Sequence, residues 1–348
     1  MKMRYLATLT LCAIAALPIH AQSTAIVQEN ELAMVYYMPL TQIAITIEYE
    51  EVTMQPGMFF QYAERYLGTK DVVTEPQTLY HITAINANTR AIADKERTFK
   101  VVAQRGMDAQ LLSLTEDGIL CGYNIPPQQP MPMPFPPQMP PQEPAPVSVP
   151  LLEEQMLANS TAKMAEGTAK QIYRLRETRL NILSGDVEHA PADGQAMQLV
   201  MNELNQQEQQ LTALFVGKKS VKHHHKTIYF TPSEDVQEVL CRFSRFAGVV
   251  AADDLSGEPI MLTLTGQKQT LLPADDTKKS KSQPSQIYYN LPGTADIQIV
   301  YGTMTVKNTF QIAQYGVAIP LALDLFTSNN TPHIYFNTQT GNISSIQK

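Results

Sequence analysis

Alternating apolar and polar residues mark the first element of the chain. Between Thr41 and Glu50, apolar side chains recur at every second position and Thr or Glu fills most of the positions between them. A period of two predicts a strand with one face in a core. Pro56 and Gly57 end this strand, and the period then changes: apolar residues from Phe59 to Leu67 fall on one side of a short helix that Gly68 can close.

Further strands follow before the middle of the chain. The pattern predicts strands near Leu79–Ile85 and Thr98–Ala103, and a hairpin formed by 111–114 and 119–123 around Glu116, Asp117 and Gly118. The unit from 23 to 124 is long enough to bury its own core. We therefore expect a small antiparallel β-rich domain with one short helix.

A proline-rich segment separates this unit from the rest. Twelve of the 24 prolines lie between Pro126 and Pro150, with methionines interspersed. Repeated loss of backbone donors excludes sheet and helix and favours a disordered or polyproline II linker. A ligand for an aromatic groove or a soft-metal site using Met131, Met133 and Met139 are the alternatives.

Two amphipathic helices are predicted after the linker, over 151–217. The first runs to Ser184 and ends at Gly185; the second starts at Asp193, carries an apolar stripe from Met197 to Phe215, and closes at Gly217. Two antiparallel helices packed as a coiled-coil-like hairpin satisfy both patterns. Such a pair is too weak to stand alone, so we expect it to pack on a β domain, on a second copy or on a partner.

The last third, 220–348, reads as a second β-rich domain with a short helix of its own. Thr231, Pro232, Ser233 and Glu234 resemble a capping box with proline at the first helical position. This predicts a helix that buries Val236, Val239, Leu240, Phe243 and Ala247, stops at Gly248, and leaves Cys241 off the buried face. Strands are predicted at 222–230, 260–265, 287–291, 295–301 and 303–312, with later pieces near 317–323 and 334–337.

The amino terminus predicts export. Lys2 and Arg4 precede an apolar run from Tyr5 to Leu17, and Ala21 follows at a plausible cleavage point, the pattern of a signal peptide over 1–21. The run is too short for a stable membrane span, and no later run is long enough, so we expect no transmembrane segment.

Cleavage after Ala21 changes the charge and the cysteine count. It leaves 24 basic against 33 acidic residues, with no basic cluster that would favour a nucleic-acid partner. It also leaves two of the three cysteines, Cys121 and Cys241. In an oxidising compartment they are candidates for a disulfide between the two halves, and the alternative is that at least one is a buried thiol.

Candidate chemistry is sparse. His223 and His225 would point the same way on a strand, where two imidazoles can approach one metal ion. The alternative is an exposed edge strand protected by Lys222, Lys226 and the imidazoles. The sequence contains no nucleophile elbow, zinc-protease helix or phosphate loop, so no catalytic residue or cofactor is assigned.

Scattered turn and aromatic residues resemble a family of exported Bacteroidales proteins of unknown function. The residues that carry this resemblance are Tyr36, Tyr37, Pro39, Pro56, Gly57, Tyr62, Ala63, Tyr66, Leu67, Gly68, Asp117, Gly118, Leu120, Gly122, Asn124, Tyr288, Tyr289, Leu291, Pro292, Gly293, Ala295, Ile312, Ala313, Gln314, Gly316 and Pro320. The resemblance implies a periplasmic or cell-surface location in a Gram-negative bacterium and carries no activity.

The sequence thus predicts an α+β protein: two mainly antiparallel β-rich domains, each with a short helix, joined by the linker and the helical hairpin. Its expected role is that of a non-enzymatic envelope adaptor, scaffold or binding module whose hairpin contacts protein partners or a second copy. The alternative is a periplasmic enzyme or metal-binding protein that uses the strand from His223 to His225.

Overall fold

The computed structural model describes residues 33–102, 112–125, 160–186, 194–270, 286–321 and 332–347. The predicted signal peptide, the proline-rich segment, residues 151–159 and the Asp193 cap lie outside these ranges. The strands are β1 (Ala33–Gln55), β2 (Gln77–Val102), β3 (Leu112–Leu114), β4 (Leu120–Tyr123), β5 (Lys218–Phe230), β6 (Val236–Ser244), β7 (Gly248–Val250), β8 (Glu258–Gln267), β9 (Tyr288–Tyr301), β10 (Met304–Pro320), β11 (His333–Phe336) and β12 (Ile343–Gln347). The helices are the 3-10 turn η1 (Phe60–Tyr62), α1 (Ala63–Leu67), α3 (Thr161–Ser184) and α4 (Gly194–Val216).

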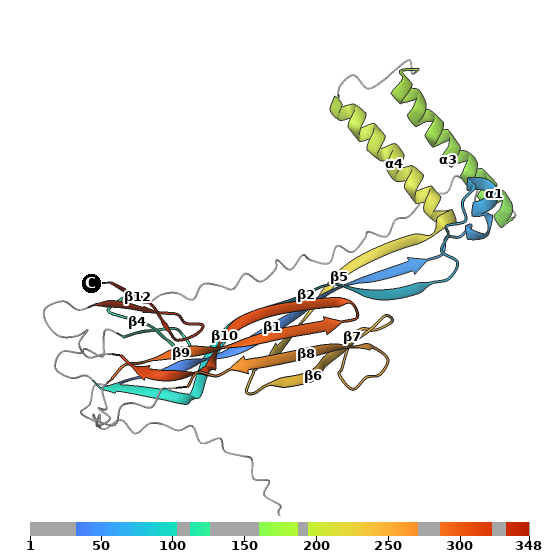
Figure 1. Ribbon diagram of the computed structural model, residues 1–348. Coiled ribbons are helices and arrows are strands. Elements are labelled where there is room, and N and C mark those ends of the chain that lie inside the picture. The colour runs from blue at the N-terminus through green and yellow to red at the C-terminus, as the bar shows by residue number, and fades with distance from the viewer. Residues whose placement is uncertain are drawn as a thin grey trace, which may run out of the picture.

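The described strands form three antiparallel sheets, which confirms the α+β prediction. Their strand orders are β2-β1-β5, β10-β9-β8-β6-β7 and β12-β11-β4-β3. The first two sheets pack face to face, and the small third sheet lies at one end while the helices project from the other (Figure 1). β1 has 23 residues and connects these regions, since a strand of that length spans roughly 75 Å.

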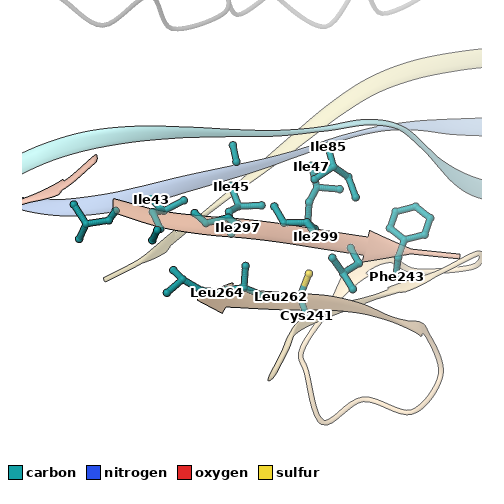
Figure 2. Packing of buried hydrophobic residues seen from close by; sticks show 14 of the residues in the cluster. Ile43, Ile45, Ile47, Ile85, Cys241, Phe243, Leu262, Leu264, Ile297 and Ile299 are labelled. Atoms are coloured by element: carbon teal, nitrogen blue, oxygen red, sulfur yellow. The ribbon is translucent and has the colours of Figure 1, made fainter. Parts of the chain in front are cut away.

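The main core lies between the first two sheets. Ile43, Ile45 and Ile47 of β1 are fully buried, as the alternation predicted. They face the apolar side chains of β6, β8 and β9, and Figure 2 shows the two layers of side chains meeting. The partners in this cluster include Ile85, Cys241, Phe243, Ile260, Leu262, Leu264, Ile297 and Ile299. This burial of branched apolar side chains from two sheets is the arrangement of a β-sandwich.

The two β-rich segments of the sequence, 23–124 and 220–348, share two of the three sheets. β1 pairs along its second half with β5, from Ile43 opposite Phe230 to Gln55 opposite Lys218. β4 pairs with β11, where Ile334 lies opposite Tyr123. The apolar face of β1 is covered by strands of the later segment, so the earlier one completes its core only by contact with the later one.

The prediction of a helix after the apparent capping box is wrong, because residues Val236–Ser244 form the strand β6. The segment before β6 is fixed by β10: the Gln314 side chain donates to the Pro232 carbonyl (2.9 Å) and the Tyr315 hydroxyl donates to the Glu234 carbonyl (3.2 Å). β6 then pairs with β8, and the register shifts between Val239 and Cys241. This bulge inserts one extra residue into the alternation, which gives the apolar positions their helix-like spacing.

Two shorter predictions are confirmed. The hairpin of β3 and β4 has the expected antiparallel pairing, with Gly118 in the left-handed region. The short helix α1 is closed by Gly68 at a φ of 69°, the conformation that glycine adopts without steric cost.

Candidate functional site

The helical hairpin of α3 and α4 is the most distinctive element of the fold, and its base is tightly fixed. α4 continues through Gly217 into β5, so the hairpin is joined directly to the three-stranded sheet. The Phe59 N–H donates to the Leu214 carbonyl (2.7 Å) and the Val73 N–H to the Val216 carbonyl (2.9 Å). The loops next to β1 and β2 therefore hold the last turn of α4 in place by hydrogen bonds.

An apolar cluster fills the space around this base. Phe59, Ala63, Ala165, Ile172 and Phe215 are all fully buried, and the Phe59 and Phe215 ring centroids lie 5.3 Å apart. The cluster joins η1 and α1 to both long helices. Burial of each large apolar side chain contributes roughly 1.5–3 kcal/mol, so the hairpin is firmly attached to the sheet.

Both ends of α3 carry ordinary helix signals. The Ser160 hydroxyl accepts a hydrogen bond from the Lys163 N–H (3.3 Å), which caps the first turn. Gly185 follows the last residue in the left-handed conformation, as its place in the sequence predicted. With 24 residues, α3 extends about 36 Å from base to tip.

An ionic contact connects the two helices midway. The Glu208 carboxylate of α4 accepts hydrogen bonds from Arg176 (2.6 Å) and Arg179 (2.5 Å) of α3, and Arg179 also donates to the Asn205 side chain (2.9 Å). The Glu208 side chain is 14% exposed. Glu208 interrupted the apolar stripe in the sequence, and here it replaces an apolar contact by a carboxylate shared between two guanidinium groups.

The hairpin has fully buried residues only at its base. The buried residues of α3 end at Ile172 and those of α4 begin at Leu211. No residue of the described outer half, defined as 173–184 and 194–210, is buried. Leu180, Leu183 and Leu199 are 64%, 67% and 71% exposed. The outer half therefore presents leucines to solvent on helices that project from the sheets (Figure 1).

The histidine strand lies in β5, at the edge of the three-stranded sheet, as the edge-strand alternative predicted. His223 and His225 are both exposed. Glu50 of β1 contacts His223 (3.4 Å) on one side and His81 of β2 (2.9 Å) on the other. Glu50 lies opposite both histidines in the register, so these side chains form a row across the strands.

His224 points to the other face of β5. Its Nε2 lies 2.9 Å from the Glu51 carboxylate, and its ring stacks on Tyr49 with centroids 5.3 Å apart. Within the described ranges, no group of three or more His, Cys, Asp or Glu side chains converges as metal ligands would. The row of His81, Glu50 and His223 thus joins strands through carboxylate–imidazole contacts.

A groove of about 730 Å³ lies beside this row. Its lining is apolar and aromatic, with Tyr80, Phe243, Phe246 and Tyr301 among its residues, and Lys219, Arg245 and Glu258 supply charge. Burial raises the pKa of the Tyr301 hydroxyl, and the nearby Glu258 carboxylate adds to this shift. No local sequence pattern predicts this groove, because its residues come from six separate strands and from turns between them.

The two candidate disulfide residues are buried thiols on different sheets. Cys121 lies on β4 and Cys241 on β6, 1% and 3% exposed respectively. Cys241 faces the main core beside Leu262 and Ile299 (Figure 2). Its expected availability for a bridge depended on the helix predicted for this segment, and the strand turns its side chain inward instead.

Comparison with known proteins identifies a family for this chain. The family described as Domain of unknown function (DUF4831) matches residues 33–344. No curated protein and no solved structure matches the chain. In the described part of the chain, no helix has the combined length and apolar character that a bilayer crossing requires. The match spans nearly all of the sheets and both long helices, so the chain belongs to the DUF4831 family.

Proposed function

We propose that this protein is a non-enzymatic, exported envelope protein that acts as an adaptor or scaffold and engages a protein partner through the outer half of its helical hairpin. The observation that carries the proposal is the contrast between the two halves of the hairpin. The base is buried against η1 and α1, whereas the outer half exposes Leu180, Leu183 and Leu199.

Physical chemistry supports a binding role for such an arm. An antiparallel pair of helices buries one seam and leaves the rest of both surfaces in water, so a protein partner can add apolar burial there. The fixed base limits the entropy lost when the arm binds, because its orientation relative to the sheets is already restricted.

The proposed location follows from the amino terminus. The charged start, the short apolar run and Ala21 support export and cleavage. Cell fractionation with amino-terminal sequencing of the purified protein tests this part separately. A mature chain that begins at Gln22 in the periplasmic or surface fraction is expected, and an uncleaved cytoplasmic chain would contradict it.

Crosslinking in cells tests the adaptor role. The full chain is compared with a variant in which Leu180 and Leu199 are both replaced by Glu, and with a control in which Leu255, 81% exposed in the turn before β8, is replaced by Glu. We expect the crosslinked species to disappear for the double variant and to persist for the control. Species that are indifferent to both changes would refute a role for the hairpin.

A further inference from the structure

We infer that the occupant of the hairpin's outer half is a second copy of this chain, with α3 of one copy packed against α4 of the other. This inference rests on the proposed function, because it names the partner of the same surface.

The outer half of the hairpin lacks a core of its own. Beyond Leu175, which packs against the base cluster, α3 carries Leu180, Ile182 and Leu183, and none of these three side chains is buried. A pair of helices reaches the burial of a four-helix bundle only when a second pair covers it. Two hairpins supply four helices of nearly equal length, since α3 has 24 residues and α4 has 23.

The two helices differ in charge over the outer half. Residues 173–184 of α3 carry three arginines and one acid, Glu177. Residues 194–210 of α4 carry two acids, Glu203 and Glu208, and no basic residue. Within one hairpin, Arg176 and Arg179 share the single carboxylate of Glu208, so the outer half of α3 keeps a net positive charge while α4 also carries Glu203. Helices of opposite charge attract when they lie side by side, although each exposed pair contributes little.

Symmetry then favours a second copy over an unrelated helix. A two-fold axis places the same surface on both chains, so every contact of α3 with α4 occurs twice. One hairpin offers both a basic and an acidic helix, and it is therefore complementary to itself in this arrangement. An unrelated partner would have to supply both signs in the matching order.

Sedimentation equilibrium of the full chain tests the inference. Over about 1 to 100 µM we expect a reversible monomer–dimer equilibrium, with the dimer at twice the 38.8 kDa of one chain before any processing. Replacing both Leu180 and Leu183 by Glu should weaken the dimer at least about tenfold, whereas Leu255→Glu should leave it unchanged. Far-UV circular dichroism checks that the variants keep their helices.

Salt provides a second measurement that needs no substitution. If α3 meets α4 of the other copy, raising the salt to about 0.5 M should weaken the dimer, because screening acts on the exposed charges between the chains. A dimer that is insensitive to salt would overturn the pairing of α3 with α4. If the protein still dimerises when both Leu180 and Leu183 are replaced by Glu, the outer half of the hairpin is not the dimer surface.

The inference and the proposed function fail in different ways. If the full chain is a monomer at every concentration but still crosslinks to another protein through Leu180, the second copy is refuted and the adaptor role stands. If neither a dimer nor a hairpin-dependent crosslink is found, both fall.

Discussion

The Gln314 side-chain amide forms hydrogen bonds with both backbone groups of Thr41. Its Oε1 accepts a hydrogen bond from the Thr41 N–H (2.9 Å), and its Nε2 donates to the Thr41 carbonyl (3.0 Å). The Thr41 hydroxyl in turn accepts from the Ala313 N–H (2.9 Å). A side-chain amide thus takes the place of a neighbouring strand at the point where β1 passes β10.

Replacement of Gln314 by Ala should lower the free energy of unfolding by about 1 to 3 kcal/mol, since the backbone groups of buried Thr41 lose partners. Urea denaturation measures the change. Gln311→Ala is the matched control: Gln311 is exposed on the same strand, and its loss should alter stability by no more than about 0.5 kcal/mol. Equal effects of the two substitutions would contradict the role assigned to the amide.

Gly57 allows the loop after β1 to touch α4. A Cβ at this position would lie 2.3 Å from the Leu214 carbonyl oxygen and 2.6 Å from the Ala213 carbonyl oxygen, so a side chain must push the helix away. Gly57→Ala should destabilise the protein by about 1 to 3 kcal/mol.

The control for Gly57 is Gly194, at the start of α4, where nothing lies within 4 Å of an added Cβ. Gly194→Ala should be neutral or stabilise by up to about 1 kcal/mol, because alanine favours the helix. Hydrogen exchange of α4 amides distinguishes the sites: protection near Leu214 should fall only in Gly57→Ala. Unchanged protection there would refute the close contact.

Glu208 should be the most sensitive charged residue of the hairpin. Glu208→Ala leaves Arg176 and Arg179 without their shared carboxylate, and since the Arg176 side chain is 37% exposed the expected loss is modest, about 1 to 2 kcal/mol. Glu203→Ala, which removes an exposed acid from the same helix, should cost less than about 0.5 kcal/mol. Thermal melting followed at 222 nm compares them; a larger loss for Glu203→Ala would contradict the contact.

Both cysteines should resist alkylation in the native protein at pH 8. Burial removes access to the thiols of Cys121 and Cys241, and it raises the pKa of the Cys241 thiol to about 11, so little thiolate is present. Iodoacetamide followed by mass spectrometry should find neither residue modified before unfolding and both modified in guanidinium. A protein that resists modification even when unfolded without reductant would instead contain the disulfide.

The same thiol should make stability depend on pH in alkali. Because the folded pKa of Cys241, about 11, lies above the unfolded value near 9, its contribution is fully present below pH 9 and is lost as the pH rises through 11. The loss should reach about 2 to 3 kcal/mol.

Buried tyrosines act in the same direction, so the comparison with Cys241→Ala isolates the thiol. The stability difference between wild type and variant should shrink from pH 9 to 11 in urea denaturation. A constant difference would show that Cys241 does not titrate with folding.

Local sequence patterns predicted the elements that depend mainly on residues nearby in the sequence. The alternation around Ile45 placed β1, and the glycines at 68 and 185 ended α1 and α3 as expected. The segment after Pro232 forms a strand and not the predicted helix, because its hydrogen bonds go to Gln314 and Tyr315, about eighty residues away, and because a bulge alters the spacing of β6.

The candidate site was partly predictable for the same reason. The apolar stripes and terminal glycines of α3 and α4 predicted a helical hairpin from neighbouring residues alone. Which part of it stays exposed depends on Phe59 and Ala63, which reach the base from the distant segment that forms η1 and α1. The row of Glu50 between His81 and His223 likewise requires three strands to be aligned, which no single segment encodes.

The shared sheets also set the order in which this protein can fold. β4, at residues 120–123, needs β11, at residues 333–336, for one of its neighbours, and the Tyr36 hydroxyl bonds to the backbone of Tyr288, 252 residues later. Contacts this distant in sequence form slowly and only after most of the chain has been made. While synthesis proceeds from the amino terminus, the apolar face of β1 therefore stays exposed until the later strands have been made. During that interval the cell has to protect it.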